Sequence, residues 1–317
     1  MEIPLTIAHF GGSPQHLKLS LKSAAQFNRQ VVLIGDESNN HLWVNHWNSD
    51  QAGMGKFRRF MNSYVKMSDY PDSYETAFWK RPFVVEAWMK SEGVKELFLI
   101  DSDVLSFADY SKEVAPLLPN NCRATLMQYI GERWASLHFS YWTREALEDF
   151  TDFCFKAYED RNIRLELEAK YRWHIDNRSP GGVCEMTLLY LWAEKNSGAV
   201  VNLAKVVNNT VADEAIHSPK NYFDDEYELR AGFKRLVFRR GVPYGFNKIL
   251  KQEIRFWCLH CQGDSKRLMR WLESGCMRNY FTHLERLNRH VGVLKRKSKS
   301  YIHGTLKYLV RRGQKIM

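Results

Sequence analysis

The sequence predicts an α/β fold in which a mixed, mainly parallel sheet is flanked by helices. Short apolar runs without helical spacing, at residues 3–9, 31–34 and 97–100, indicate buried strands. The segments between these runs carry apolar residues at helical spacing. Strands that alternate with helices of this length require right-handed crossovers, which place the strands parallel in one sheet.

The first half of the chain supplies the start and stop signals of this pattern. Ser13-Pro14 predict an N-cap and a proline at the first helical position, for a helix that continues to about Phe27. Gly35-Asp36 end the second strand. A further helix ends at Gly93, directly before the third strand, and its apolar side carries Phe78, Val84, Val85 and Trp88.

The second half is more varied. Four segments have the composition of strands: residues 123–129, 137–142, 234–240 and 254–260. The turn-rich residues 241–245 separate the last two. Three segments are expected to be helical: residues 143–158, capped by Thr143, residues 161–176, and an apolar helix at 183–195 that follows the glycine-containing turn 179–182.

The charge distribution divides the chain into a domain at residues 1–276 and a basic helical extension at residues 277–317. The extension contains 11 Lys or Arg and one acidic residue, whereas residues 1–276 contain 35 Lys or Arg and 35 Asp or Glu. Basic segments bind polyanions. Residues 301–312 have apolar and basic faces at helical spacing, so an anionic membrane surface is the expected partner. Nucleic acid is not expected, because no aromatic RNA-recognition signature is present. The alternative is a solvated helical surface.

The composition predicts a globular protein of the cytoplasm, peripheral at the inner membrane face if the extension binds there. An apolar content of 44% suffices for a core, and no apolar stretch approaches the 18 residues of a membrane span. The first residues lack the basic-then-apolar order of a signal peptide. The six scattered cysteines predict reduced core thiols. This includes Cys258 and Cys261, which have no second ligand pair for zinc.

The most informative motif is Asp101-Ser102-Asp103, directly after the apolar strand 97–100. In open α/β sheets, ligands bind at the carboxyl ends of the strands. Two carboxylates one residue apart suit a hard divalent cation that also binds substrate phosphates. Side chains of an extended pair point to opposite faces, so a turn must begin at Ser102 for both to meet one ion. The competing interpretation is a helix cap or a surface turn.

A second polar segment follows the last expected strand. The imidazole of His260 can complete a coordination shell begun by carboxylates. Gly263 lets the backbone approach a phosphate, and Asp264 or Ser265 is expected to cap a helix that begins there. Lys266 then lies in the first turn, where the free amide groups favour an anion. The alternative is a buried, hydrogen-bonded histidine beside a solvated lysine.

Four more polar residues are candidates for the site. Glu185 opens an apolar helix behind a glycine pair that would give a substrate access to the backbone; alternatively its carboxylate only complements the helix dipole. Lys80 and Arg81 are candidates to neutralise a leaving diphosphate, against a plain surface position. Asp36, at the end of the second strand, is a candidate acceptor for a nucleotide base or ribose.

On these motifs the chain resembles the GT-A class of nucleotide-sugar glycosyltransferases. It is most similar to small bacterial enzymes that join Asp-x-Asp to a late His-x-x-Gly-x-x-Lys, as family-8 glycosyltransferases do. The matching stretches are residues 31–36, 97–105, 181–189 and 259–269. The resemblance implies a GT-A fold and transfer of a sugar from a nucleoside diphosphate sugar, by default a UDP-sugar. It also implies a glycan or lipid-linked acceptor, and Mn²⁺ or Mg²⁺ as cofactor.

The resemblance also implies roles for individual residues. Asp103 would be the main carboxylate ligand of the metal, Asp101 would touch metal and ribose, and His260 would be the third ligand. Lys266 would hold the diphosphate as it leaves, and Glu185 would lie beside donor sugar and acceptor. The other residues implied to line the nucleotide are Ala8, His9, Phe10, Gly11, Ser102 and Gly263.

Two features leave the stereochemistry of transfer open. Arg267-Leu268 stand where family-8 enzymes usually continue with Pro-Trp, and the aspartate or asparagine that they carry near the reacting sugar has no clear match. Retention and inversion are therefore both possible. An inverting reaction needs a base on the acceptor hydroxyl, and Glu185 is the only candidate for it.

Two other functions compete with this one. A phosphatase of the haloacid dehalogenase class would use Asp101 as nucleophile, Asp103 as acid/base and Asp224-Asp225 as a metal pair. In that class the loop that carries the nucleophile normally lies near the N-terminus, at the start of the fold. Here two strand–helix units precede Asp101. A non-enzymatic protein would instead act through residues 277–317 on an anionic surface or RNA.

Overall fold

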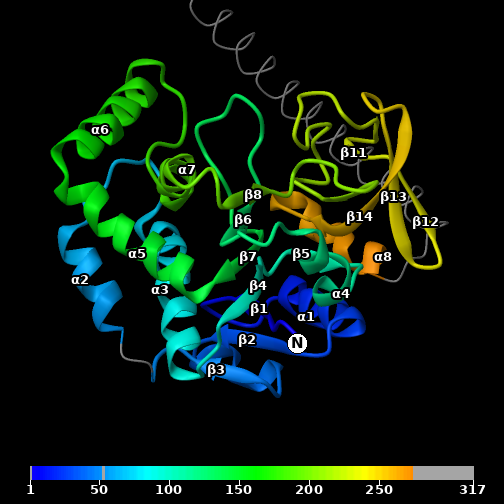
Figure 1. The fold of residues 1–317 in the computed structure, drawn as a ribbon, viewed down its shortest axis with the longest axis horizontal. Helices are drawn as coiled ribbons and strands as arrows, with labels where there is room; N and C mark the ends of the chain where they lie inside the picture. Colours follow the sequence, from blue (N-terminus) through cyan, green and yellow to red (C-terminus); the bar gives the residue numbers. More distant parts are fainter. Residues whose placement is uncertain (1, 52–53, 274–317) are drawn as a thin grey trace, which may run out of the picture.

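A seven-stranded mixed sheet forms the centre of the computed structural model, which describes residues 2–51 and 54–273 (Figure 1). Its strand order is β3-β2-β1-β4-β7-β6-β8, and neighbours run parallel except on the two sides of β7. The strands are β1 (Leu5–Ala8), β2 (Val31–Gly35), β3 (His46–Asn48), β4 (Glu96–Ile100), β6 (Ala124–Leu126), β7 (Phe139–Thr143) and β8 (Val200–Asn202). The predicted α/β class with a mixed, mainly parallel sheet is confirmed.

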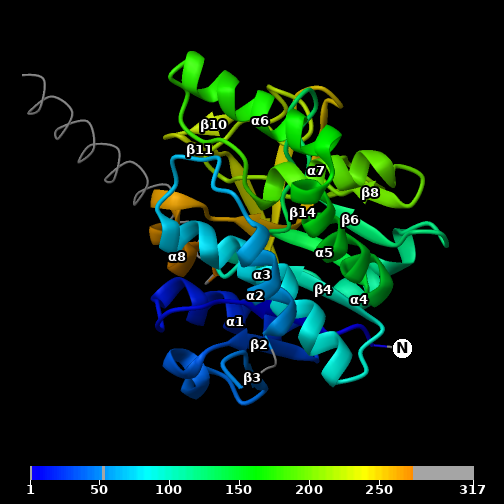
Figure 2. The same cartoon turned by 90° about the vertical axis from the view of Figure 1, so that its left-hand side faces the viewer.

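Helices cover both faces of this sheet because its strands are apolar on both sides. Leu97 and Leu99 of β4 belong to a hydrophobic cluster to which α6 (Arg161–Asp176) contributes two buried residues and four other helices contribute most of the rest: α2 (Gly55–Ser63), α3 (Asp72–Ser91), α5 (Arg144–Glu159) and α7 (Glu185–Lys195). Phe98 and Ile100 of the same strand face α1 (Gln15–Phe27) and α4 (Tyr110–Glu113). Figures 1 and 2 show α2, α3 and α5 together on one side, with α6 beyond them.

A second sheet, which the sequence analysis did not predict, stands beside the first. Its order is β12 (Leu236–Arg239), β13 (Val242–Asn247), β14 (Gln252–His260) and β5 (Val104–Ser106), all antiparallel. The strand β9 (Thr210–Ala212) runs parallel to β14. A small hairpin, β10 (Leu229–Arg230) with β11 (Phe233–Lys234), and the short helices η1 (Glu37–Leu42), η2 (Ala115–Leu117), η3 (Gly263–Leu268) and α8 (Met269–Glu273) complete the described elements.

Several local predictions are confirmed. The helices expected at residues 143–158 and 161–176 are α5 and α6, and Thr143 Oγ1 accepts a hydrogen bond from the Ala146 amide at 3.2 Å as the N-cap of α5. The five cysteines in the described part of the chain are free and buried. No helix there is long and apolar enough to span a membrane. The predicted extension at residues 277–317 lies outside the described residues.

Three local predictions are wrong. Ser13 does not cap α1: its hydroxyl donates to the Ser38 carbonyl at 3.2 Å, and Pro14 takes the N-cap position with an extended ψ of 154°. The strand expected at residues 234–240 is divided between β11 and β12. The turn-rich residues 241–245 belong largely to β13, where Pro243 precedes the stretch paired with β14 and so removes no hydrogen bond to that strand.

The apolar helix expected at residues 183–195 begins at Glu185, and the preceding Gly182 explains its placement. Gly182 has φ of +136°, and a Cβ there would lie 2.3 Å from the Met67 carbonyl oxygen. Next to it, the Val183 amide donates to the same oxygen at 2.8 Å. Gly182 therefore permits close backbone packing that anchors the start of α7. On the side where a Cβ of Gly182 would stand, protein backbone fills the space, so the missing side chain at Gly182 serves this packing.

Replacing Gly182 by alanine is expected to lower the free energy of unfolding substantially. The backbone conformation alone costs a non-glycine residue about 1–3 kcal/mol, and the displaced Met67–Ser68 backbone adds to this. Chemical denaturation measures the loss. Gly198→Ala is the matched control, because nothing lies within 4 Å of a Cβ there and its φ is ordinary. Equal stability of the two variants would contradict this account of Gly182.

Candidate active site

The candidate site lies where the strand order of the central sheet reverses. β2 and β4 flank β1 on its two sides, and both run parallel to it. Open α/β sheets bind ligands at the carboxyl ends of strands at such a point, because the connections leave there in opposite directions. His9 follows β1 and Ser102 follows β4, and His9 Nδ1 lies 3.0 Å from Ser102 Oγ.

A tight turn brings Asp101 and Asp103 to the same place. The Val104 amide donates to the Asp101 carbonyl at 3.1 Å, which closes the turn over Ser102 and Asp103. One ligand atom each of Asp101, Asp103 and His260 lies within 4.8 Å of the others. The turn that the sequence analysis required for a shared ion is therefore present.

The second sheet delivers His260 to these carboxylates. Val104 of β5 pairs with His260 of β14, and the Cys261 amide donates to the Asp103 carbonyl at 2.9 Å. His260 Nε2 then lies 3.4 Å from Asp103 Oδ1. On the other side of the ring, Nδ1 donates to the Glu214 carbonyl at 2.7 Å. This bond fixes the ring orientation and directs Nε2 at the carboxylates, as outer-shell partners of metal-binding histidines do.

A buried group that the sequence analysis missed supports His260 from behind. Asp213 Oδ2 accepts from the His260 amide at 3.0 Å, and Lys234 forms a fully buried ion pair with Asp213. The ring of His138 stacks on that of His260 with centroids 4.0 Å apart, and its Nε2 lies 3.0 Å from the Asp213 carbonyl. Asp213 was detectable, because it follows the apolar pair Val211-Ala212 as Asp101 follows Ile100.

Charge pairing sets the protonation of Asp103 and His260. Burial acts to raise the pKa of Asp103, but His260 and Lys266 outweigh it and hold the pKa well below its ordinary value. Burial acts to lower the pKa of His260, but the hydrogen bond and charge of Asp103 raise it to about 9. Lys266 Nζ lies 3.2 Å from Asp103 Oδ2. Without a cation, two positive groups therefore neutralise Asp103 at neutral pH.

Arg81 and Glu185 form the other side of the site. Arg81, on α3, pairs with Asp101 and, through Nη2, with Glu185 Oε1 at 3.2 Å. Glu185 is 2% exposed, and its Oε2 has no hydrogen-bond partner among the described residues. Burial raises the pKa of Glu185, although the charge of Arg81 acts against it. Arg81 is thus engaged by two carboxylates.

These groups surround one cavity of about 870 Å³. Its lining includes the predicted residues Arg81, Asp101, Asp103, Glu185, His260, Gly263 and Lys266. Sequence reasoning missed the aromatic wall, which is made of Tyr74, Phe78 and Trp134, together with the imidazoles of His138 and His217.

The helix after His260 differs from the prediction. η3 starts at Gly263, and its N-cap Gln262 makes no side-chain capping bond. Neither Asp264 nor Ser265 caps it, because the Ser265 hydroxyl donates to the Gln262 carbonyl instead. Lys266 is the fourth residue of this short helix. Its contribution to the site is the positive charge that its side chain places beside Asp103.

The residues predicted around the first two strands form a neighbouring group that does not line this cavity. Asp36 Oδ2 accepts from the Gly11 amide at 2.6 Å, and its Oδ1 caps η1 through the Ser38 amide at 3.0 Å. Lys80 Nζ lies 4.3 Å from the ring centroid of Phe10. Ala8 ends β1. The His9–Ser102 contact joins this group to the Asp101–Asp103 turn.

The metal pair of the phosphatase alternative is not assembled. The side chains of Asp224 and Asp225 are 75% and 74% exposed. Asp224 accepts from the Tyr129 hydroxyl and pairs with Lys220 at 3.0 Å, and Asp225 pairs with Lys248. Neither lines the cavity of Asp101. This arrangement disfavours a reaction in which they share a metal with Asp101.

The chemistry of Asp101, Asp103 and His260 fits a hard divalent cation. Carboxylate oxygens are the ligands that Mg²⁺ prefers, and Mn²⁺ accepts an added imidazole nitrogen. Their ligand atoms already lie close together without rearrangement of the backbone. A cation there competes with Lys266 and with the proton of His260 for Asp103, because all three neutralise one carboxylate.

No protein-family model matches the chain, and no curated protein matches it in sequence. Among solved structures, mouse xyloside xylosyltransferase 1 in its apo form is similar with TM-score 0.46 and 8% identity, over 64% of this chain and 85% of that one. The PaToxG glycosyltransferase gives TM-score 0.39 and 10% identity, over 62% and 70%. A glycosyltransferase involved in glycosylation of the major capsid of PBCV-1 gives 0.28 and 8%, over 50% and 68%. All three TM-scores are below 0.5, so they assign this chain no reaction.

The charge pairing of His260 predicts a pH-dependent contribution to stability. Because its folded pKa of about 9 exceeds the usual 6.5, the stabilisation is complete below pH 6.5 and is lost as the pH rises through 9. With EDTA present, the difference in unfolding free energy between the parent and His260→Gln is expected to shrink over this interval, as measured by urea denaturation.

His16→Gln provides the control for this titration. Burial lowers the pKa of His16 to about 4, so its own difference from the parent stays constant above pH 6.5. A His260→Gln difference that is equally constant would refute the ion pair with Asp103.

Proposed function

We propose that this protein is a metal-dependent glycosyltransferase that moves a sugar from a nucleoside diphosphate sugar to a glycan or lipid-linked acceptor. The observation that carries the proposal is the convergence of Asp101, Asp103 and His260 within 4.8 Å at the switch point of the sheet. Lys266 adds a positive charge to the same cavity. A divalent cation and a lysine side by side suit a diphosphate, and these residues belong to the motifs on which the resemblance rests.

The leaving diphosphate explains the positive groups of the site. Asp101, Asp103 and His260 would hold Mn²⁺ or Mg²⁺, which supplies Lewis-acid stabilisation of the leaving oxygen. Lys266 would move its ammonium group from Asp103 to the diphosphate oxygens, where it stabilises charge that develops in the transition state. Its side chain is 38% exposed, so this movement requires no opening of the core.

Glu185 is the proposed group beside the reacting sugar. Transfer breaks the bond from the anomeric carbon to the diphosphate oxygen and forms one to the acceptor oxygen, whose proton must leave. In an inverting reaction Glu185 takes that proton through Oε2, which is free of protein partners in the described structure. Arg81 holds the other carboxylate oxygen. In a retaining reaction Glu185 flanks the donor sugar instead, and the anomeric configuration of the product distinguishes the two.

The nucleoside is proposed to lie over the carboxyl ends of β1 and β2. Ala8, His9, Phe10 and Gly11 follow one another there, and the His9–Ser102 contact links them to the proposed metal ligands. Asp36 and Lys80 border the same loop through Gly11 and Phe10. UDP is the proposed nucleotide because of the resemblance to family-8 enzymes.

A nucleotide that binds the native state is expected to raise the melting temperature of the protein in the presence of Mn²⁺. A ligand at 100 times its Kd adds about 2.7 kcal/mol of stability. A thermal-shift panel of nucleoside diphosphates and nucleotide sugars, each with Mn²⁺ and with EDTA, measures the effect. The shift should disappear in Asp103→Asn and His260→Gln and persist in the control Asp224→Asn, whose side chain lies outside the cavity.

The same panel, combined with an assay of phosphate release, distinguishes a glycosyltransferase from a phosphatase. A Mn²⁺-dependent shift with UDP or GDP supports the transferase and names its nucleotide. The absence of any nucleotide shift, together with Mg²⁺-dependent release of phosphate from a phosphomonoester, would instead favour a phosphatase with Asp101 as nucleophile.

We also propose that residues 277–317 hold the enzyme at the cytoplasmic face of an anionic membrane, near a lipid-linked acceptor. Their 11 basic residues and single acidic residue support this. A chain that ends at residue 276 is expected to lose co-sedimentation with anionic liposomes and to keep donor hydrolysis. Undiminished binding of the shortened chain to these liposomes would refute the proposal.

A further inference from the structure

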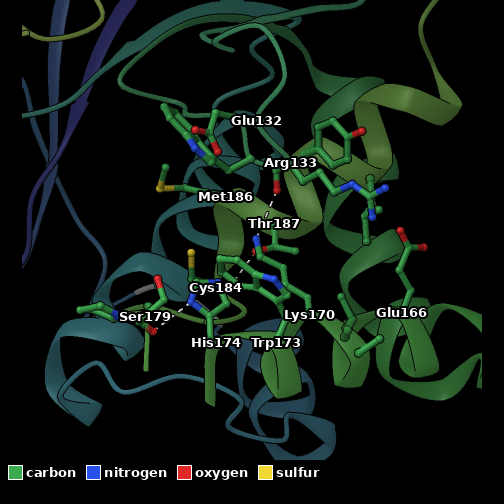
Figure 3. A pocket seen from close by; sticks show the side chains of 18 of the residues that line it. Glu132, Arg133, Glu166, Lys170, Trp173, His174, Ser179, Cys184, Met186 and Thr187 are labelled. Carbon is green, nitrogen blue, oxygen red and sulfur yellow. Dashed lines mark hydrogen bonds between the residues drawn. The ribbon is translucent and has the colours of Figure 1, made fainter. Parts of the chain in front are cut away.

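A second cavity, of about 780 Å³, adjoins the proposed donor site (Figure 3). Side chains of α6, the loop at residues 131–134, the turn at residues 179–182 and the first turn of α7 line it. Trp134 and Met186 line both cavities. Met186 directly follows Glu185, the proposed reacting carboxylate. A molecule seated in the second cavity therefore borders the place where the sugar would be transferred.

Aromatic side chains give this cavity the character of a saccharide site. Tyr70, Trp134, Trp173 and Tyr190 all contribute to its lining. Trp173 is 56% exposed, although it is among the largest apolar side chains of the chain. An exposed aromatic face at the rim of a cavity marks a binding surface, because a ligand with apolar C–H groups, such as a sugar ring, can cover it.

Lys170 adds a positive charge inside the cavity. Its Nζ donates to Thr187 Oγ1 at 2.8 Å and to the Arg133 carbonyl at 3.2 Å, and Figure 3 shows both bonds. No carboxylate oxygen in the described part of the chain lies within 4.0 Å of Nζ, and burial lowers its pKa. The carboxylates that line the cavity, Glu132 and Glu166, belong to exposed side chains at its edge.

This arrangement supplies Lys170 with two protein acceptors among the described residues. An ammonium group has three donors, and the two protein acceptors are neutral. The charge of Glu132 stabilises this partly buried ammonium group only from a distance. An anionic ligand would supply both the third acceptor and a counter-charge in direct contact. Thr187 and the Arg133 carbonyl hold the ammonium group in place to receive it.

We propose that the second cavity binds the acceptor, and that the acceptor is a saccharide carrying an anionic group, a phosphate or a carboxylate, which pairs with Lys170. The inference rests on the proposed glycosyltransferase function and adds the class of acceptor. The sugar rings pack against the aromatic side chains of the second cavity, and the hydroxyl that receives the sugar reaches Glu185 past Trp134 and Met186.

The test compares matched saccharides with the full-length protein, UDP and Mg²⁺, which is diamagnetic and therefore does not broaden the ligand signals. The probes are glucose, galactose, mannose and N-acetylglucosamine, each as the neutral methyl glycoside, the 6-phosphate and the corresponding uronate. Ligand-observed NMR measures their affinities, because it detects weak binding. At least one anionic form is expected to bind roughly tenfold or more tightly than its neutral counterpart, as one charge-assisted hydrogen bond provides. Preference for the 6-phosphate or for the uronate identifies which anion is recognised.

Substitutions in the second cavity test whether Lys170 causes the preference for anionic saccharides. Lys170→Met should remove the preference for the anionic form, and Lys170→Arg should keep part of it. Trp173→Ala should weaken neutral and anionic forms alike. Lys18→Met, at an exposed position on α1, is the matched control and should change nothing. A purely structural role of Lys170 would lower stability and weaken every probe together, without changing the ratio of anionic to neutral affinity.

The outcomes separate this inference from the proposed function. Equal affinities for neutral and anionic forms, or no binding of any probe, would overturn the anionic acceptor while the Mn²⁺-dependent nucleotide shift persists. If the parent protein shows no Mn²⁺-dependent nucleotide shift, the proposed glycosyltransferase function itself is refuted. Lys170→Met should leave the nucleotide shift unchanged, because Lys170 does not line the donor cavity.

Discussion

The antiparallel pairing of β5 with β14 is the constraint on which the whole site depends. β5 begins directly after the Asp101–Asp103 turn, and β14 ends at His260, so the register Val104↔His260 fixes where the imidazole meets the carboxylates. The Cys261–Asp103 backbone hydrogen bond closes the same contact. A shift by one residue would turn His260 to the opposite face of the strand. The central sheet places the carboxylates, and the second sheet completes the ligand set.

Charge balance explains how so many ionisable groups remain buried together. Asp101, Asp103 and Glu185 are each paired with Arg81, His260 or Lys266, and buried carboxylates are tolerated when they are paired in this way. The three positive side chains differ in how far they are exposed to solvent, and therefore in how easily they can move. The side chains of Arg81 and His260 are 10% and 7% exposed, whereas that of Lys266 is 38% exposed. Lys266 is therefore the partner that can leave Asp103 when ligands enter, while the other two keep the carboxylates in position.

Five strands of the central sheet and most of the charged site could be predicted from the sequence, because these features are local, whereas the short edge strands β3 and β8 were not predicted. A short apolar run ended by a carboxylate or an imidazole located Asp101, Asp103 and His260. The second sheet was not predictable in this way, because β5 and β14 are distant in the chain and pairing leaves no local signal. Gly245 added a misleading turn signal. In the structure it lies in β13, where a Cβ would come within 2.9 Å of the Phe256 ring.

Helical geometry explains why donor and acceptor would meet at α7. Successive residues of an α-helix are turned by about 100°, so Glu185 and Thr187 project from α7 in nearly opposite directions. Glu185 accordingly lines the first cavity and Thr187 the second, with Met186 bordering both. The close packing at Gly182 fixes the start of this helix. One rigid helical turn thus sets the position of the proposed catalytic carboxylate relative to Lys170, which Thr187 holds from the other side. The sequence could not reveal this coupling, because Lys170 belongs to a helix whose charged residues otherwise predict only a solvated surface.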